Sequence, residues 1–298
     1  MKLNSDKMNN LINNTINLKL DEIDDFNFPI DEPFSLKINN EGVIYDFIIR
    51  FSSMNKNLVC CASGAHSRDQ RTSNGELIKP PYFDRWSWYK YFDESFIAFS
   101  DPIFYYNDEI TLGWCVGDKN QWYLEVISQI ISKLAKNQKI INDNILFFSS
   151  SGGGFVSVGL ATLLKNSKCL INNSQFSVFN YYKKHINNLF KILKKEFNDL
   201  SESEISEMIL HRLDLIELFK KEKFMPDITY YVNVCSEDDI DNHCIPFVNE
   251  VLELPYFKNN LNVCFYHEDK SKPHHALETN KTLKILRNFI KSELYNDE

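Results

Sequence analysis

The feature that most constrains the fold is one stretch in the middle of the chain, ILFFSSSGGGFVSVGLATLL (residues 145–164). It opens with an apolar run, Ile145 to Phe148, which is too short for a helix and rich enough in aromatic residues for a buried strand. Three serines and three glycines follow, and apolar residues then recur at helical spacing from Phe155 to Leu164. The stretch therefore predicts a strand, a tight turn of small residues and a helix.

This turn has the form of a nucleophile elbow, in which a strained turn between strand and helix presents a reactive serine. The motif reads Gly-x-Ser-x-Gly, and residues 149–153 fit it with Ser149 in place of the first glycine. Ser151 is then the nucleophile, and the N–H of Gly152, at the positive end of the helix, would face an oxyanion. Two other interpretations compete. One is a phosphate-binding turn, although the lysine of a P-loop is missing, and the other is a structural turn without chemistry.

The composition is that of a globular protein with a sizeable core, since 43% of the residues are hydrophobic and 25% are charged. The 298 residues carry a net charge of -8, which argues against a nucleic-acid binder, because such a protein presents a basic patch. We expect no secretory signal, because the N-terminal residues contain no apolar segment. We also expect no membrane span, because no apolar run approaches about 18 residues.

The seven cysteines lie mostly within apolar runs and form no Cys-x-x-Cys pair. They are expected to be buried and reduced, which favours a cytoplasmic location. A metal site built from His243, Cys244, His274 and His275 is an alternative, but these residues lack zinc-type spacing on a single element. The prediction is therefore that no metal is bound.

Strands and helices alternate along the chain, which predicts an α/β fold with a mostly parallel sheet flanked by helices. Residues 1–30 are rich in Asn and Asp and are expected to form a loosely attached N-terminal arm, followed by a single domain over residues 31–298. The expected strands are residues 35–40, 43–51, 57–62, 95–101, 145–148, 169–171, 227–234 and 261–268, and the main expected helices are residues 122–134, 155–164, 245–251 and 277–294.

One segment departs from this alternation. Residues 177–224 are charged and helical in pattern, without a strand signal, and Ser201 and Glu204 form a capping box for one of the helices. Because connections between strands and helices are normally short, the segment is interpreted as a helical cap inserted over the site. The alternative is an ordinary but enlarged crossover connection.

The loop after the strand at residues 57–62 is a candidate for the second half of an oxyanion hole. In α/β-hydrolases the loop at this place supplies a backbone N–H, and Gly64 and Ala65 are small enough to let a substrate approach closely. His66 and Arg68 lie at the same mouth and are candidate substrate contacts. The alternative for both is a solvated loop.

Two further residues are candidate substrate contacts. Trp86 lies in an aromatic segment and could stack on a sugar ring, although a position in the core is the default for tryptophan. Asp101 falls at the end of a predicted strand, where substrate contacts collect in open α/β sheets.

A serine nucleophile needs a base, and the base needs an acid that fixes its tautomer. In α/β-hydrolases the order along the chain is Ser, acid, His, with each residue on a loop at the carboxyl end of a strand. Asp238 and Asp239 follow one late strand, and His274 and His275 follow the next. A turn that begins at Ser236 favours Asp239, with Asp238 as the fallback. The position just before the last helix favours His275 over His274.

Together these segments resemble α/β-hydrolase-fold proteins found with bacterial capsule and surface-polysaccharide synthesis, including serine-dependent polysaccharide O-acetyltransferases. The resemblance is carried by FFSSSGGGF, by RWSW, by SDP after the fourth strand and by HH before the last helix, and it extends from residue 43 onward. The chain differs at Ser149, where the family elbow has glycine, and in the size of its helical insert.

The resemblance implies an acyl-transfer enzyme without a permanently bound cofactor, for which acetyl-CoA is an expected acyl donor. Transfer to a sugar hydroxyl would O-acetylate a surface polysaccharide or its precursor. Transfer to water would instead make the protein a carboxylesterase or deacetylase that acts on acylated glycans or small esters. A third hypothesis is a non-catalytic protein that binds a glycan or a partner on the same fold, against which the complete Ser, Asp and His set argues. The sequence leaves the oligomeric state open.

Overall fold

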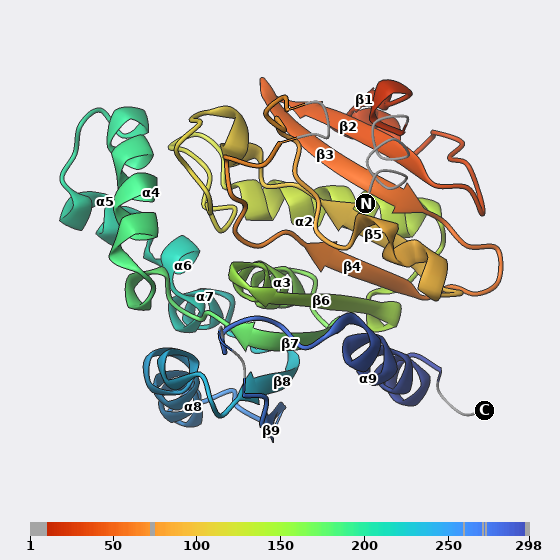
Figure 1. The fold of residues 1–298 in the computed structure, drawn as a ribbon. Coiled ribbons are helices and arrows are strands. Elements are labelled where there is room, and N and C mark those ends of the chain that lie inside the picture. Colours follow the sequence, from red (N-terminus) through yellow and green to blue (C-terminus); the bar gives the residue numbers. More distant parts are fainter. Residues whose placement is uncertain (1–10, 72–74, 259, 270, 272, 296–298) are drawn as a thin grey trace.

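A mixed β-sheet runs through the centre of the molecule in the computed structural model, which describes residues 11–71, 75–258, 260–269, 271 and 273–295 (Figure 1). The strands are β1 (Ile16–Lys19), β2 (Phe34–Asn40), β3 (Val43–Arg50), β4 (Leu58–Ala62), β5 (Ser95–Phe99), β6 (Ile145–Ser151), β7 (Lys168–Ser174), β8 (Asp227–Asn233) and β9 (Leu261–Tyr266). Within the described residues they pair in the order β1-β2-β3-β5-β4-β6-β7-β8-β9.

Most neighbouring strands run parallel, as the alternation of strands and helices predicts. β3 pairs antiparallel with β2 and with β5, and the remaining pairs are parallel. The carboxyl ends of β4 to β9 consequently meet at one edge of the sheet. The loops after these strands are therefore brought together, which is where ligands bind in open α/β sheets.

Helices cover both faces of this sheet. The α-helices are α2 (Tyr123–Asn137), α3 (Gly152–Leu163), α4 (Lys183–Glu196), α5 (Glu202–Met208), α6 (Leu210–Leu213), α7 (Leu215–Glu222), α8 (Ile245–Leu252) and α9 (Thr279–Glu293). Shorter turns of other helix types are η1 (Leu20–Ile23), η2 (Trp86–Tyr91), η3 (Pro102–Tyr105), η4 (Asn142–Asn144), η5 (Val178–Asn180) and the π-helical η6 (Asp239–Cys244).

Successive residues of the central strands face two separate apolar cores. In β4, Leu58 and Cys60 pack with α2, α3, α7 and α8, whereas Val59 and Cys61 pack on the opposite face with α9 and η2. The apolar part of β6 alternates in the same way, so each of its residues is buried. Burial on both faces explains why these strands appear in the sequence as continuous apolar runs.

Part of the predicted N-terminal arm is a strand. β1 pairs in parallel with β2 at the edge of the sheet, and Ile23 in η1 is completely buried. The prediction of a loosely attached arm is therefore wrong for these residues, because pairing with a strand further along the chain holds them. Residues 1–10 of the predicted arm lie outside the described part of the chain.

The predicted insert is helical throughout most of its length. It comprises η5 and α4 to α7, and the predicted capping box of Ser201 and Glu204 begins α5. The helices differ in their surroundings. α4 and α5 pack on each other and stand away from the sheet, at the left of Figure 1. α7 packs against α3 and α8, so it belongs to the layer that covers the sheet.

Among the described residues, none of the helices combines the length and the apolar character that crossing a membrane requires.

The close contact between α3 and β7 generates a prediction about Gly154. A side-chain carbon added at this position would lie 2.3 Å from Oγ and 2.7 Å from Cβ of Ser174. We expect Gly154→Ala to lower the free energy of unfolding by about 1–3 kcal/mol, because a packed interior must shift to admit the methyl group. Urea unfolding measures this loss.

A double-mutant cycle with Ser174→Gly separates the clash from a general effect of alanine. Removing the Ser174 side chain should make Gly154→Ala less costly than it is in the wild-type background. Equal costs in the two backgrounds would show that this contact does not determine the need for glycine.

Candidate active site

Ser151 lies at the junction of β6 and α3, where the backbone is strained. Its φ of 55° and ψ of -133° are outside the conformations that residues with side chains usually adopt. Small residues close the turn, since a side-chain carbon on Gly152 would lie 2.5 Å from a methyl carbon of Leu112. The junction therefore has the strained strand–turn–helix geometry that characterises a nucleophile elbow.

The serine that replaces the first glycine of the motif has a place in this geometry. Ser149 is completely buried, and its hydroxyl accepts a 2.8 Å hydrogen bond from the N–H of Ala62. The same hydroxyl lies 2.9 Å from the carbonyl oxygen of Ala62, to which it can donate. Ser149 thus fastens the end of β6 to the end of β4, so the departure from glycine adds a contact to the elbow.

The hydroxyl of Ser151 begins a hydrogen-bonded chain that ends at a buried carboxylate. Its Oγ lies 2.9 Å from Nε2 of His274, and Nδ1 of the same ring lies 2.7 and 2.9 Å from the two carboxylate oxygens of Asp239. Because an ionised carboxylate only accepts, Nδ1 carries the ring proton and Nε2 accepts from the serine. The three groups therefore stand in the order that a serine nucleophile, its base and an orienting acid require.

Asp239 is brought to His274 by the turn that the sequence analysis singled out. It begins η6, is completely buried and accepts a 2.6 Å hydrogen bond from the hydroxyl of Ser236. The neighbouring Asp238 accepts a 2.7 Å hydrogen bond from the side chain of Asn242 instead. Of the two candidate acids, Asp239 is thus the one that meets the histidine.

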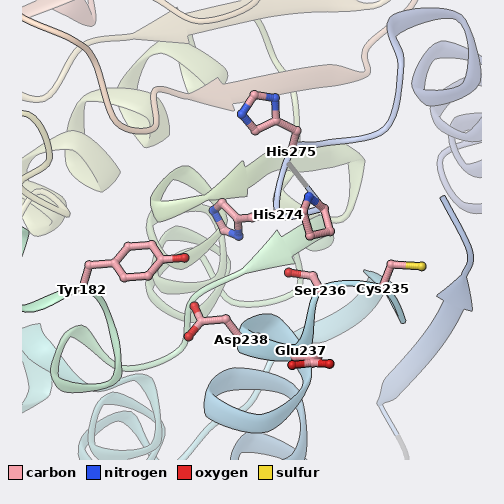
Figure 2. Close-up of a pocket in the computed structure, with 8 residues that line it drawn as sticks. Tyr182, Cys235, Ser236, Glu237, Asp238, His274 and His275 are labelled. Carbon is pink, nitrogen blue, oxygen red and sulfur yellow. The ribbon is translucent and has the colours of Figure 1, made fainter. Parts of the chain in front are cut away.

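The structure contradicts the choice of His275 as the base, because His274 occupies the position between Ser151 and Asp239. The two imidazole rings point in different directions in Figure 2. Adjacent side chains of a turn leave the backbone in different directions, so only one of the two histidines can lie between Ser151 and Asp239. Both histidines follow the predicted strand, and spacing along the sequence could not distinguish them.

Two buried asparagines, which the sequence analysis missed, hold the histidine loop in this register. The amide nitrogen of Asn173 lies 3.1–3.3 Å from the carbonyl oxygens of Pro273, His274 and His275. Asn233 donates to the carbonyl oxygens of Glu268 and Pro273, at 2.9 and 3.1 Å. The available signal was a run of polar residues, Asn172 to Gln175, that directly continues an apolar strand.

Two further side chains near Ser151 were also missed. Gln175 is completely buried, and its amide nitrogen lies 3.2 Å from Oγ of Ser151. Burial raises the pKa of Tyr181, while hydrogen bonds with Ser151 and Gln175 act in the opposite direction. Tyr181 follows η5 in the helical insert, so the insert contributes directly to the surroundings of the serine.

The predicted oxyanion donors have different environments. Gly152 begins α3, a position where helix N–H groups lack partners within the helix. The N–H of Gly64 instead donates a 2.8 Å hydrogen bond to a carboxylate oxygen of Asp84, which contradicts its assignment as an oxyanion donor. Ala65 lines a cavity beside this loop. Gly152 and Ala65 therefore remain predicted donors.

His66 and Arg68 line the same cavity of about 690 Å³, whose opposite wall includes residues of α4. Arg68 is held at 2.9 Å by Asp108, and its guanidinium lies over the ring of Tyr82. The ring of His66 stacks on the same Tyr82 ring, with 5.1 Å between the two ring centres. Burial lowers the pKa of His66. The cavity thus lies between the loop that follows β4 and the helical insert, and the two predicted contact residues, His66 and Arg68, are on its wall.

The structure does not bring Trp86 or Asp101 to a substrate. Trp86 is only 8% exposed and belongs to the core on the α9 side of the sheet. Asp101 is 5% exposed and accepts hydrogen bonds from the N–H groups of Ile103 and Cys115, so it caps η3 and fixes the following loop. Both predictions are wrong, because packing against α9 covers Trp86 and the cap of η3 engages the carboxylate of Asp101.

A second cavity, of about 460 Å³, lies directly beside His274 (Figure 2). The ring of Tyr182, from the insert, forms one wall, and Glu237 and Asp238 contribute carboxylates. Tyr182 is 49% exposed, so an aromatic surface is accessible next to the histidine.

No protein-family model matches the chain, and no match is found among curated proteins. Solved structures do match its fold. The capsule O-acetyltransferase of Neisseria meningitidis serogroup A superposes with a TM-score of 0.60 at 13% identity, over 85% of this chain and 96% of that one. A mutant of the same acetyltransferase has been solved in complex with CoA.

Two other solved structures, a serine hydrolase and a protein complex, are also similar in fold. FphF, a fluorophosphonate-binding serine hydrolase of Staphylococcus aureus, matches with a TM-score of 0.54 at 11% identity, over 89% of this chain and 99% of that one. A glycosylation-associated protein complex (Gap123) of Streptococcus agalactiae matches with a TM-score of 0.58 at 13% identity, over 89% of this chain but 48% of that one. These similarities confirm the predicted α/β-hydrolase fold.

The buried carboxyl of Asp101 should make stability decrease as pH rises. Burial raises its pKa from 3.8 to about 6, so the folded state binds the proton more tightly than the unfolded chain does. This stabilisation is complete below about pH 4 and is lost as the pH rises through about 6. Asp101→Asn cannot ionise, so its stability relative to wild type should rise by about 2 kcal/mol between about pH 4 and about pH 7 in urea unfolding. A difference that stays constant over this range would contradict the prediction.

Proposed function

We propose that this protein is a serine-dependent acyl-transfer enzyme in which Ser151 carries the acyl group. The observation that carries the proposal is the hydrogen-bonded chain from Ser151 through His274 to Asp239, which begins at a strained elbow. A purely structural turn has no need for a histidine and a buried carboxylate in this order. A phosphate-binding turn gains nothing from a base that accepts the serine proton.

The proposed acylation uses each of these groups once. Oγ of Ser151 attacks the carbonyl carbon of the acyl donor while Nε2 of His274 takes the hydroxyl proton, and Asp239 stabilises the resulting imidazolium. The N–H groups of Gly152 and Ala65 donate hydrogen bonds to the carbonyl oxygen and so stabilise the negative charge that develops on it. The leaving thiolate or alkoxide departs with the proton from His274, which leaves the acyl group on Ser151.

We further propose that the acyl group is acetyl, that acetyl-CoA donates it and that the acceptor is a hydroxyl of a bacterial surface polysaccharide or its precursor. Support comes from the similarity in fold to a capsule O-acetyltransferase that has been solved with CoA. The two cavities beside the site offer separate places for donor and acceptor. The insert covers both as a cap, with Tyr182 and α4 in their walls. His66 and Arg68 are the proposed substrate contacts.

We place the reaction in the cytoplasm, where acetyl-CoA is available. The seven cysteines are free thiols, as a reducing compartment would keep them. A glycan, a small molecule or both are the proposed partners.

An esterase is the second candidate function. The fold is also similar to that of FphF, a serine hydrolase, and the chemistry on Ser151 would be the same. The two functions differ only in what removes the acyl group. A transferase must hold a sugar hydroxyl where an esterase admits water.

Ser151→Ala should abolish covalent labelling by a fluorophosphonate, because the reagent reacts with an activated serine. His274→Ala should lower kcat by at least about a thousandfold with p-nitrophenyl acetate, since the base is lost. His275→Ala is the matched control, because it removes the adjacent histidine and should leave kcat close to that of wild type. Intact mass and initial rates measure these effects. A wild-type protein that is never labelled would instead favour the non-catalytic binding protein.

Acetyl-CoA with and without oligosaccharide separates the two candidate functions. A transferase should show an acetyl group on Ser151 by intact mass after mixing with acetyl-CoA alone, and added acceptor glycan should remove it. This follows because water is poorly placed in a site shaped for a sugar hydroxyl. Rapid release of free acetate that no glycan changes, with faster turnover of simple esters, would identify an esterase.

A further inference from the structure

The carboxamide of Gln175 bridges the serine hydroxyl and a buried tryptophan. Its Nε2 lies 3.2 Å from Oγ of Ser151, and its Oε1 accepts a 2.6 Å hydrogen bond from Nε1 of Trp114. Gln175 follows β7 directly, and its backbone N–H reaches the carbonyl oxygen of Ser151 at 3.4 Å. The side chain is therefore part of the immediate surroundings of the reacting oxygen.

The orientation of this carboxamide follows from which of its neighbours can donate a hydrogen bond. An indole N–H can only donate, so the carboxamide oxygen faces Trp114 and the NH2 group faces Ser151. Trp114 is itself held in place, since it is 1% exposed and its ring meets that of Tyr181 edge-on, with 5.9 Å between the ring centres. Gln175 thus presents a preorganised hydrogen-bond donor to the nucleophile.

This donor also fixes the direction of the serine proton. The NH2 group of Gln175 can only donate, so it cannot take the serine proton. Oγ accepts from Gln175, and its own proton is then directed to Nε2 of His274, 2.9 Å away.

We propose that Gln175 is a catalytic residue that donates a hydrogen bond to Oγ of Ser151 as this oxygen leaves the acyl group. The inference rests on the proposed function, because it requires an acyl group on Ser151. In this step the acceptor hydroxyl attacks the acyl carbon and gives its proton to Nε2 of His274. The bond between the acyl carbon and Oγ then breaks, Oγ keeps the electron pair, and the proton on His274 passes to it. Gln175 stabilises the negative charge on Oγ until that proton arrives.

The donor should accelerate removal of the acyl group more than its attachment. Before acylation, Oγ is a hydroxyl oxygen and already accepts the hydrogen bond, so little is gained during the attack. In the acyl-enzyme, Oγ is an ester oxygen, which accepts weakly because its lone pair is delocalised into the carbonyl group. The hydrogen bond strengthens only as charge returns to Oγ, and an interaction that strengthens in the transition state lowers the barrier.

Two substitutions at this position test the inference. Gln175→Met fills similar space without a donor, and Gln175→Glu retains an acceptor for Trp114. Ser151 is acetylated with p-nitrophenyl acetate, excess reagent is removed, and loss of the acetyl group is followed by intact mass. We expect Gln175→Met to slow this loss by about 10- to 100-fold, while release of p-nitrophenolate in the first turnover changes by less than about threefold.

A pH series distinguishes a donor from a residue that only fills space. A protonated carboxyl group can donate, whereas a carboxylate cannot. The rate of acetyl loss in Gln175→Glu, divided by the rate in Gln175→Met at the same pH, should therefore rise as the pH falls. A ratio that does not change with pH would overturn the inference.

Gln121→Met is the matched control, because Gln121 is another buried glutamine, whose side chain bonds to Tyr45 and Asn40. It should lose the acetyl group at the wild-type rate. Acetyl loss in Gln175→Met that is as fast as in wild type, or slowed no more than its acylation, would overturn the inference. A wild-type protein that never acquires the acetyl group would overturn the proposed function itself.

If Gln175→Met does not fold, Trp114→Phe replaces it in the test. This substitution leaves Gln175 in place but removes the donor that orients its carboxamide. Acetyl loss should again slow while first-turnover release of p-nitrophenolate changes little. An unchanged rate of acetyl loss would overturn the inference.

Discussion

The strained backbone of Ser151 is the constraint on which the rest of the site depends. Its φ of 55° and ψ of -133° cost about 1–3 kcal/mol, and such a conformation persists only where its surroundings hold it. Here three contacts do so. Ser149 binds the end of β6 to β4, the N–H of Gln175 meets the carbonyl group of Ser151, and Gly154 lets α3 lie against β7. The fold thus fixes the nucleophile from both neighbouring strands and from the helix, before any substrate binds.

Neutral amides do most of the positioning around this serine. Asn173 and Asn233 hold the backbone of the histidine loop, and Gln175 contacts the nucleophile. All three are buried at or just after the carboxyl ends of β7 and β8. An amide supplies a donor and an acceptor without a net charge, so it can direct groups in a buried site without the desolvation cost of an ion. In the proposed mechanism the charge of Asp239 is then left to stabilise the imidazolium of His274.

The parts of the site that could be predicted from the sequence are those that local pattern determines. Apolar periodicity changes from strand to helix within a few residues of Ser151, and the order Ser, acid, His reflects the chain direction of a parallel sheet. The choice between His274 and His275 could not be predicted, because Asn173, a hundred residues away along the chain, sets the loop register. Likewise, pairing with β2 makes a strand of residues assigned to an arm, and Trp86 is buried in the core that α9 helps to form. In these three cases the outcome depends on a partner in another element of the fold.

The position of the insert along the chain links it to Ser151, His274 and Asp239. It begins directly after β7, and the segment from Asn173 to His185 contacts the site at several points. Asn173 holds the histidine loop, Gln175 and Tyr181 contact Ser151, and His185 in α4 hydrogen-bonds with Thr111 at 2.9 Å. A short connection therefore joins α4 to side chains that bind Ser151 and the loop of His274. Because the walls of both cavities include residues of this insert, occupation of either cavity bears on the same segment. One continuous segment of the chain therefore supplies wall residues to both cavities and holds both Ser151 and the loop of His274.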